Sequence, residues 1–501
     1  MTASLAFLSA TDLVEMIRQR KIGSLELVDL YIQRIEEHDP AINAVVARDF
    51  ERARDRARAA DEAMIRGEDW GALHGLPITI KDSFEVVGMP CTSGSSALKD
   101  HYPARNADLV EKLLDAGAVI LGKTNLPLFA GDCQSFNAVY GQTNNPWNVE
   151  RVPGGSSGGA AAALAAGLTA LELGSDIGGS IRNPAHMCGV VGHKSSFGIT
   201  SMRGHIPPMP GTFVGDYMPA GDLVAAGPLA RSAKDLEMAL ALMVWPGRAQ
   251  RGAWELNLPP ARWNSLREFR VGLWLDDSSF PVDASVLRLL ESAVKKLSEA
   301  GVRVEARHPE LDFSRSNEVF QLLLRCLSSP GLPDEQFEGI AVEAAELADA
   351  ERDARALSLR ATAMRHRDWL RLEGERTRMR QVWADFFDEF DVLLCPAFPT
   401  TAFPHDHTED RFRRTLQINH AEFSYVDVST AWAGLSGVVY LPSTTVPIGL
   451  ADDGLPVGIQ IVAPFLEDRT SIRFAELVED VFGRLGAPPD FGTGLDAERV
   501  R

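Results

Sequence analysis

Three segments of the chain concentrate serine, lysine and glycine. Lys81 closes the run ITIK, Ser156 and Ser157 lie in GGSSGG, and Ser180 follows two glycines in GSDIGGSIR. An acyl-transfer site needs these residue types: a nucleophile, a base within hydrogen-bond reach, and backbone N–H groups aimed at the developing oxyanion. The three segments are therefore candidates for acyl-transfer chemistry.

The glycines before Ser180 suit an anion-binding turn. Gly178 and Gly179 leave the backbone bare, so consecutive N–H groups from Ile177 to Ser180 can converge on an oxyanion. Each such donor is worth about 2.7–4 kcal/mol in comparable sites. A tight turn between a strand and a helix would use the same residues, and the motif alone leaves both interpretations open.

The general base is harder to assign from the residues. The histidines show no Ser-His-Asp pattern, although His186 and His193 are near Ser180 in sequence. Lysine is the other option, and it must be uncharged, because only then can it accept a proton; burial can lower a lysine pKa by roughly 3–5 units. Lys81 ends an apolar run, where a buried lysine could sit, but it also fits an ordinary strand end paired with Asp82. From the residues alone the base stays open.

Strands and helices must alternate around these segments to position them. The run 77–80 is apolar and β-type, and a helical pattern then leads through a glycine to a strand at 118–121. The alanine-rich stretch 160–168 predicts a helix of small side chains that packs closely. Later strands are predicted at 391–403, 437–450 and 454–464. This alternation predicts an α/β fold with helices packed on a sheet.

No flexible linker, internal repeat or low-complexity tract divides the chain, so one compact α/β body with insertions is predicted. Within it we expect four parts. They are a helical segment at 1–70 packing on the core, a core with the reacting residues at 71–235, a helical insertion or peripheral region at 236–435, and C-terminal strands and a helix at 436–501. Ser9 or Thr11 is expected to cap the first helix.

The composition argues against several classes of function. The 501 residues are 45% hydrophobic, enough for a large core, and the formal net charge is −19. Such an acidic chain is a poor candidate for binding nucleic acid or an anionic membrane surface. Five scattered cysteines without CxxC spacing fit a reducing, cytoplasmic setting and argue against a zinc site. We expect neither a signal peptide nor a membrane span.

Taken together, the motifs resemble those of the amidase signature family. The family pattern joins a GGSSGG loop, an alanine-rich helix and G-[ST]-D-x-G-G-S-[IV]-R-x-P-A-x-x-C-G-x-x-G-x-K. This chain has GGSSGG at 154–159, GSDIGGSIRNPAHMCG at 174–189 and VVGHK at 190–194. GLPITIKD matches the strand lysine of the family, and ILGKTNLP (120–127), GQTNNPWN (141–148) and GLPVGIQIVAP (454–464) are similar flanking pieces. The resemblance implies a single large domain with a mixed, twisted β-sheet core and helices on both faces.

The resemblance also implies roles for individual residues. Ser180 matches the nucleophile, Ser156 the bridging serine that follows a cis peptide bond, and Lys81 the base that begins uncharged. The N–H groups of Ile177, Gly178, Gly179 and Ser180 would form the oxyanion hole. Ser180 would attack the carbonyl while its proton passes through Ser156 to Lys81, and water would then hydrolyse the acyl-enzyme.

Neighbouring residues are expected to support or line the site. Gly155 and Ser157 would shape the loop around Ser156, and Asp176 and Arg182 would hold the nucleophile loop by charge-assisted hydrogen bonds. A segment that varies within the family supplies the substrate-pocket candidates Ala130, Gly131, Asp132, Cys133 and Gln134. Cys133 as a second nucleophile lacks an identifiable activating base. Neither a metal nor a cofactor is implied.

The resemblance implies an amidase that hydrolyses a carboxamide C–N bond of a small molecule with water. The alternatives are the A-type subunit of a glutamine-dependent amidotransferase, which releases ammonia for a partner enzyme, a carbamate or ester hydrolase, and a silent scaffold on the same fold. Leu128, in place of a common acidic residue, and the Pro-rich run 205–211 favour a stand-alone amidase. Ser195 and Ser196 replace the Pro and Thr of the family, which alters a loop beyond the reacting residues. A homodimer is considered as the assembly, and the sequence does not name the substrate.

Overall fold

The strand that carries Lys81 lies inside a mixed eleven-stranded sheet. The computed structural model describes residues 5–208, 221–327 and 329–492. In spatial order the sheet runs β1 (Val45–Arg48), β3 (Val119–Thr124), β2 (Pro77–Lys81), β6 (Leu171–Asp176), β8 (Ala225–Ala230), β7 (Val191–Lys194), β14 (Ser443–Leu450), β15 (Pro456–Val462), β11 (Val392–Pro396), β9 (Arg270–Leu273) and β10 (Arg303–Glu305). β3, β2 and β6 are parallel neighbours, as are β11, β9 and β10, and the remaining neighbours are antiparallel.

The helices of the described residues fall into three groups along the chain. Before β8 they are α1 (Ala10–Arg18), α2 (Ser24–Ile42), α3 (Phe50–Ile65), α4 (Asp108–Asp115), α5 (Gly158–Ala165) and α6 (Arg182–Cys188). Between β8 and β11 they are α7 (Ala233–Met243), α8 (Ala284–Glu299), α9 (Phe313–Cys326), α10 (Asp334–Glu346), α11 (Ala354–Thr362) and α12 (His366–Glu389). After β11 they are α13 (Tyr425–Val428), α14 (Ala431–Gly437) and α15 (Asp468–Phe482).

Short elements complete the description. Two small antiparallel pairs join β4 (Phe136–Asn137) to β5 (Gly141–Gln142) and β12 (Thr415–Ile418) to β13 (Ala421–Ser424). Single 3₁₀ turns lie at η1 (Leu5–Phe7), η2 (Ser96–Leu98), η3 (Leu128–Ala130), η4 (Leu266–Glu268), η5 (Ser329–Gly331) and η6 (Arg411–Arg413).

Helices cover both faces of the sheet. The parallel connections β2–α4–β3 and β3–α5–β6 step to opposite sides of β2, so right-handed crossovers place α4 and α5 on opposite faces. α6 packs beside α5, whereas α7 packs on α4, and α15 packs on α7. Because both faces are covered, a central strand such as β2, with the sequence PITIK, is buried along its whole length.

Most elements lie where the sequence predicts them. β2 contains the predicted strand 77–80, α5 covers much of 160–168, and Ser9 caps α1 by accepting a hydrogen bond from the Asp12 N–H at 3.0 Å. Two expectations were wrong in detail. Residues 45–48 lie inside the segment expected to be helical, yet they form β1 on the edge of the sheet, and the strand expected from 437 begins at Ser443.

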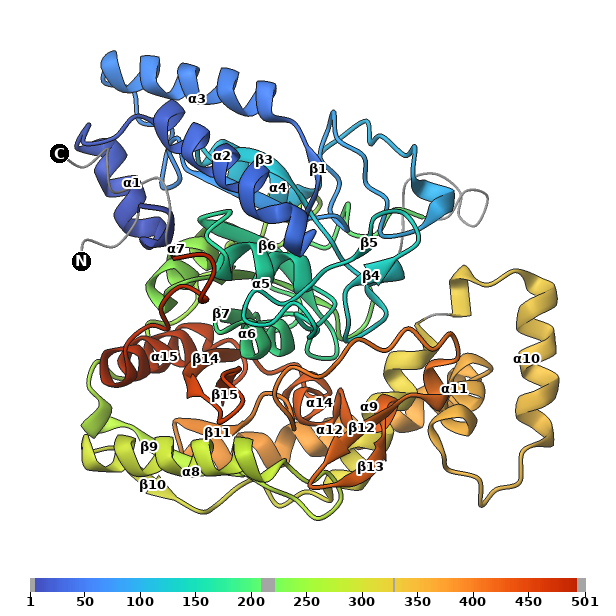
Figure 1. Cartoon of the computed structure of the whole chain (residues 1–501). Coiled ribbons are helices and arrows are strands. Elements are labelled where there is room, and N and C mark those ends of the chain that lie inside the picture. Colours follow the sequence, from blue (N-terminus) through green and yellow to red (C-terminus); the bar gives the residue numbers. More distant parts are fainter. Residues whose placement is uncertain (1–4, 209–220, 328, 493–501) are drawn as a thin grey trace.

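The region 236–435 contributes more than helices. It supplies β9, β10 and β11, which extend the same sheet, and α9, which packs on α14. α10 has no buried residue and lies at the outer edge of the molecule (Figure 1). The four-part division of the chain stays a prediction.

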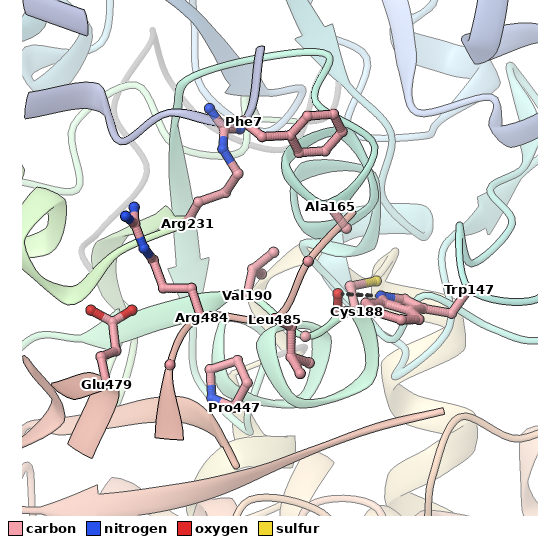
Figure 2. Close-up of a pocket in the computed structure, with 13 residues that line it drawn as sticks. Phe7, Trp147, Ala165, Cys188, Val190, Arg231, Pro447, Glu479, Arg484 and Leu485 are labelled. Carbon is pink, nitrogen blue, oxygen red and sulfur yellow. Dashed lines mark hydrogen bonds between the residues drawn. The ribbon is translucent and has the colours of Figure 1, made fainter. Parts of the chain in front are cut away.

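A small cavity of about 20 Å³ lies beside the residues that follow α15 (Figure 2). Trp147 donates its Nε1–H to the Cys188 carbonyl at 2.9 Å on one side, and Arg231 and Glu479 line the cavity as well. None of the described helices combines the length and the hydropathy that spanning a membrane requires.

Candidate active site

Lys81 is the last residue of β2, and its side chain is fully buried. Its Nζ lies within hydrogen-bond distance of two hydroxyl oxygens, Ser156 Oγ at 2.7 Å and Ser175 Oγ at 3.1 Å. Burial lowers the pKa of Lys81 to about 7, against the opposing effects of Asp176 and Glu172. Near neutral pH a large fraction of this amine is therefore uncharged and able to accept a proton.

Ser156 lies in a loop that enters α5 and is held by close backbone approaches. The Gly155–Ser156 peptide bond is cis. A Cβ on Gly155 would lie 2.6 Å from the Asp132 carbonyl oxygen, and one on Gly159 would lie 2.5 Å from the backbone nitrogen of Asn125. These glycines let the loop pass directly against two neighbouring segments, which explains why GGSSGG has so few side chains.

The loop that carries Ser180 follows β6 and is folded around Asp176. The Asp176 carboxylate accepts the N–H groups of Gly179 and Ile181, both at 2.9 Å, and the Arg182 guanidinium at 2.7 Å. Burial raises the pKa of Asp176, but Arg182 and these N–H groups outweigh it and hold the pKa well below the ordinary value. Asp176 therefore stays ionised and fixes the turn before Ser180.

Arg182 connects this loop to the other half of the sheet. It is fully buried, and besides Asp176 it donates to the Ala433 carbonyl at 2.8 Å, Ser436 Oγ at 2.9 Å and Gln460 Oε1 at 2.6 Å. These acceptors belong to α14 and β15. The predicted supporting pair thus orients the Ser180 loop on elements more than 250 residues further along the chain.

Ser157 joins the two serine segments. Its N–H donates to the Ser180 carbonyl at 3.0 Å, and its Oγ donates to the Ser175 carbonyl at 3.4 Å. Ser156 and Ser180 line the same cavity, together with Ile177 and Gly178. The fourth predicted oxyanion donor, Gly179, is instead engaged by the carboxylate of its own loop.

The cavity has a volume of about 660 Å³, within the range of small-molecule sites. Much of its wall is apolar, from Phe129 and Met202 on one side to Leu324 on α9 and Val426 on α13. Among the described residues its charged side chains are Asp132, Asp176, Arg325 and Arg411.

Four of the five predicted pocket residues line this cavity: Ala130, Gly131, Asp132 and Cys133. Asp132 accepts hydrogen bonds from Arg414, at 2.5 Å, and from the hydroxyl of Tyr425. Burial raises the pKa of the Cys133 thiol to about 12, which disfavours the thiolate that a second nucleophile would need. Gln134 lies apart from the cavity wall and exchanges two hydrogen bonds of 2.9 Å with the backbone of Asp406.

The two histidines near Ser180 in sequence do not reach the cavity. His186 bonds the Thr400 carbonyl at 2.9 Å, and His193 bonds Asp468 Oδ1 at 3.1 Å, so both serve packing between the sheet and its helices. His205, which the sequence did not single out, does line the cavity, and its Nε2 lies 2.9 Å from Ser175 Oγ. Residues 209–211 of the Pro-rich run lie outside the described residues.

Other wall residues were also missed. Gln321, Arg325 and Leu332 come from the α9 region, and Ser429 and Thr430 follow α13. They are more than 100 residues from Ser180 along the chain and carry no motif. α9 packs on α14, and residues of both regions line the cavity that Ser156 and Ser180 also line.

Comparison with known proteins identifies the family to which the chain belongs. The family model described as Amidase matches residues 26–472. This chain belongs to the amidase signature family. It is 33% identical to the A-type subunit of glutamyl-tRNA(Gln) amidotransferase from Acidothermus cellulolyticus, over 95% of this chain and 94% of the relative. It is 32% identical to fatty-acid amide hydrolase 2-A of Danio rerio, over 96% and 90%.

A solved amidase signature structure confirms the fold. A bacterial aryl acylamidase of the family matches with a TM-score of 0.78 and 26% identity, over 95% of this chain and 96% of that one. The predicted α/β domain with a large mixed sheet is therefore shown. Members of the family act on C–N bonds as hydrolases or amidotransferases, and this chain is an enzyme of that family. Among the described residues, no cluster of three His, Cys, Asp or Glu side chains is arranged to hold a metal ion.

Proposed function

We propose that this amidase signature enzyme hydrolyses a linear carboxamide through Ser180, Ser156 and Lys81. The observation that carries the proposal is the 2.7 Å contact between the buried Lys81 Nζ and Ser156 Oγ, at a cavity that Ser156 and Ser180 both line. A lysine with a pKa near neutrality, a relaying hydroxyl and a second hydroxyl open to substrate are the parts that an activated serine requires.

In the proposed acylation, Ser180 Oγ bonds to the carbonyl carbon while its proton moves to Ser156 and the Ser156 proton moves to Lys81. The oxyanion would be met by the N–H groups of Ile177, Gly178 and Ser180, which border the cavity. We leave Gly179 out of this set, because its N–H donates to Asp176.

In the second half of the proposed cycle, Lys81 returns its proton along the same path to the leaving amine, and the C–N bond breaks. Water then attacks the acyl-enzyme, gives its proton to the same relay, and releases the acid from Ser180. The relay returns that last proton to Ser180 as the acid leaves, so one amide and one water become one acid and one amine, and no oxidant or further co-reactant is required.

The cavity supports an amide with a sizeable apolar part. Its volume of about 660 Å³ exceeds what a small aliphatic amide fills, and Phe129, Met202 and Leu324 present apolar surface to it. Aryl and long-chain acyl amides are therefore the first substrates to test. Carbamates and esters of the same shape use the same chemistry and belong to the same panel.

The second candidate is glutamine hydrolysis as one component of an amidotransferase. The 33% identity to the A-type subunit of glutamyl-tRNA(Gln) amidotransferase, over nearly the whole chain, favours it. Arg325 and Arg411 in the cavity wall are groups that could receive the carboxylate of glutamine. This candidate predicts ammonia release from glutamine that rises when partner subunits are added, whereas a stand-alone amidase is fully active as a monomer or homodimer.

The deciding experiment measures turnover of acyl nitroanilides and of glutamine by the purified protein. Ser180→Ala should lose essentially all activity, because no other hydroxyl takes the place of the nucleophile. Ser314→Ala, an exposed serine bonded to Ser279, is the matched control and should leave turnover unchanged. An S180A protein that folds and still turns over at the wild-type rate would refute the assignment.

The setting we propose is the cytoplasm. All five cysteines are free, and Cys91, Cys133, Cys188 and Cys395 are buried. Unpaired buried thiols are typical of proteins in a reducing compartment. Size-exclusion chromatography of the purified chain would establish whether it is a monomer, a homodimer or part of a larger assembly.

A further inference from the structure

Among the described residues, His205 is the one histidine at the cavity, and the proposed mechanism leaves it unused although it touches the lysine network. Its Nε2 lies 2.9 Å from Ser175 Oγ, and Ser175 Oγ accepts from Lys81 Nζ at 3.1 Å. Together with the 2.7 Å bond from Lys81 to Ser156, these contacts form one chain from the imidazole to the relaying serine. The role of this series of hydrogen bonds rests on the proposed Ser180 reaction. It depends on which group donates the hydrogen in each bond.

The backbone holds His205 firmly in this place. His205 pairs as an isolated antiparallel bridge with Phe84, three residues beyond Lys81, and the two rings pack with centroids 4.7 Å apart. The next residue, Ile206, donates its N–H to the Ser83 carbonyl at 2.6 Å. The imidazole is thus fixed to the segment that directly continues β2.

The geometry at Lys81 places a demand on Ser175. An uncharged lysine has two N–H groups and one lone pair, and the lone pair must face Ser156 if Lys81 is to take its proton. Ser175 must therefore accept from Lys81, and its own hydroxyl hydrogen must point elsewhere. Otherwise the Ser175 O–H would turn to the Lys81 lone pair, 3.1 Å away, and compete with Ser156.

We propose that His205 is a positioning residue, whose Nε2 accepts the Ser175 hydroxyl hydrogen and thereby reserves the lone pair of Lys81 for Ser156. In this arrangement His205 carries its hydrogen on Nδ1. The direction of every bond then follows: Ser156 donates to Lys81, Lys81 donates to Ser175, and Ser175 donates to His205.

The electrostatics of the site agree with an imidazole that only accepts at Nε2. Burial and the positive charge of Lys81 lower the pKa of His205 to about 3, so the ring stays neutral wherever Lys81 works. The other charged groups that act on Lys81 are Asp176 and Glu172. Burial raises the pKa of Glu172 to about 8, so near neutral pH Asp176 supplies most of the negative charge.

The test follows covalent labelling of Ser180 by phenylmethylsulfonyl fluoride, measured by intact-protein mass as a function of pH. This probe needs no knowledge of the substrate: Ser180 Oγ bonds to sulfur, fluoride leaves, and the proton passes to Lys81. In His205→Leu the labelling rate at high pH should fall roughly tenfold, because part of the Lys81 lone pair is occupied. The acid limb of the pH–rate profile, where protonation of Lys81 slows labelling, should also move to lower pH. The reason is that a Ser175 O–H that donates to the uncharged amine stabilises the uncharged form of Lys81.

Conservative and double variants separate positioning from packing. His205→Gln keeps an acceptor at a similar reach and should recover most of the rate and the wild-type limb, whereas His205→Asn, which is too short, should not. Once Ser175→Ala removes the hydroxyl, adding His205→Leu should change nothing further. His101→Leu removes a histidine bonded to Glu85, away from the cavity, and should label as the wild type does.

Two outcomes would overturn the inference while the proposed reaction stands. In the first, His205→Leu labels at the wild-type rate with an unmoved acid limb. In the second, His205→Leu and His205→Gln are slowed equally with no shift of the limb, which means that the ring only packs. If wild-type Ser180 is not labelled at all, the proposed function fails first, and the inference falls with it.

Discussion

Lys81 sets the pH range in which the proposed reaction can run. Full burial brings its pKa to about 7, while Asp176 and Glu172 prevent a larger decrease. The value is a balance of desolvation against nearby carboxylates, so it depends on the strands beside β2 as much as on the lysine itself.

This balance predicts a single acid limb in the pH profile. As pH falls below about 7, Lys81 becomes charged and kcat/KM should drop about tenfold per pH unit, since only the uncharged amine accepts a proton. Lys81→Met should lower kcat by roughly 10²–10⁴-fold at every pH. Lys99→Met, at an exposed lysine, serves as control. A profile that stays flat down to about pH 5 would contradict a lysine base.

The Asp176–Arg182 pair is predicted to matter for stability as well as for the nucleophile loop. Asp176→Asn leaves the buried guanidinium without its counter-charge, so the free energy of unfolding should fall by about 3–5 kcal/mol. The control is Asp452→Asn, which breaks the exposed pair with Arg288 and should cost less than about 1 kcal/mol. Urea denaturation measures both. Equal losses of unfolding free energy in the two variants would show that the buried pair stabilises the fold no more than the exposed pair does.

At the residue scale, local motifs identify the two serines, whereas no local pattern identifies the base. GGSSGG and DIGGS identify Ser156 and Ser180 as candidates, because both segments are short and local. Nothing local shows that Lys81 is buried, since its desolvation comes from β3, β6 and the loop before α5. His205 escaped notice for the same reason: its partner Ser175 lies 30 residues away on β6.

At the scale of elements, the glycines of α5 fix how closely the helix packs. A Cβ on Gly159 would meet the backbone of Asn125 at 2.5 Å, and backbone cannot move as a side-chain end can. Gly159→Ala should therefore lower the free energy of unfolding by roughly 1–3 kcal/mol, measured by denaturant titration. Gly374→Ala on α12, where nothing lies within 4 Å, should instead stabilise the protein by about 0.5–1 kcal/mol. A Gly159→Ala variant with an unchanged free energy of unfolding would show that α5 can shift.

The elements that the sequence predicted well are those with strong local patterns. β2 and α5 carry continuous apolar or alanine-rich runs. β1, β9 and β10 are only three or four residues long, and β10 reads Arg-Val-Glu, so their pairing with distant strands decides their structure. A short polar segment becomes a strand because it can pair with the edge of a sheet. The amino-acid sequence of the segment itself does not show that such a sheet edge lies beside it.

At the scale of the whole molecule, the two ends of the chain are joined through helix caps. Asp235 on α7 accepts the Ala10 N–H at the start of α1 at 2.9 Å. Glu479 on α15 accepts the Ala233 N–H at the start of α7, also at 2.9 Å. Arg34 on α2 donates to the Phe491 carbonyl at 2.9 Å. The N-terminal and C-terminal helices therefore stabilise one another.

Glu479 makes part of this stability dependent on pH. It lines the small cavity in Figure 2, and burial raises its pKa from 4.5 to about 7. The folded state thus holds a proton that the unfolded state has already lost, so stability should fall as pH rises from about 4.5 to 7 and then level off. Glu479→Gln should remove this decline in Tm, whereas Asp480→Asn, at an exposed neighbour, should keep it. A Tm of E479Q that declines over this range as in the wild type would contradict the raised pKa of Glu479.

The cavity is built from separate parts of the chain, and this has an evolutionary consequence. Every group in the proposed relay comes from residues 81–205, while another part of the cavity wall comes from α9 and the chain around α13. Substitutions and insertions in α9 and around α13 would therefore change that part of the wall without altering residues 81–205. Diversification of such enzymes would then proceed by remodelling one side of the cavity, and recombinants that transplant the α9 to α13 region should inherit the donor's preference for amides.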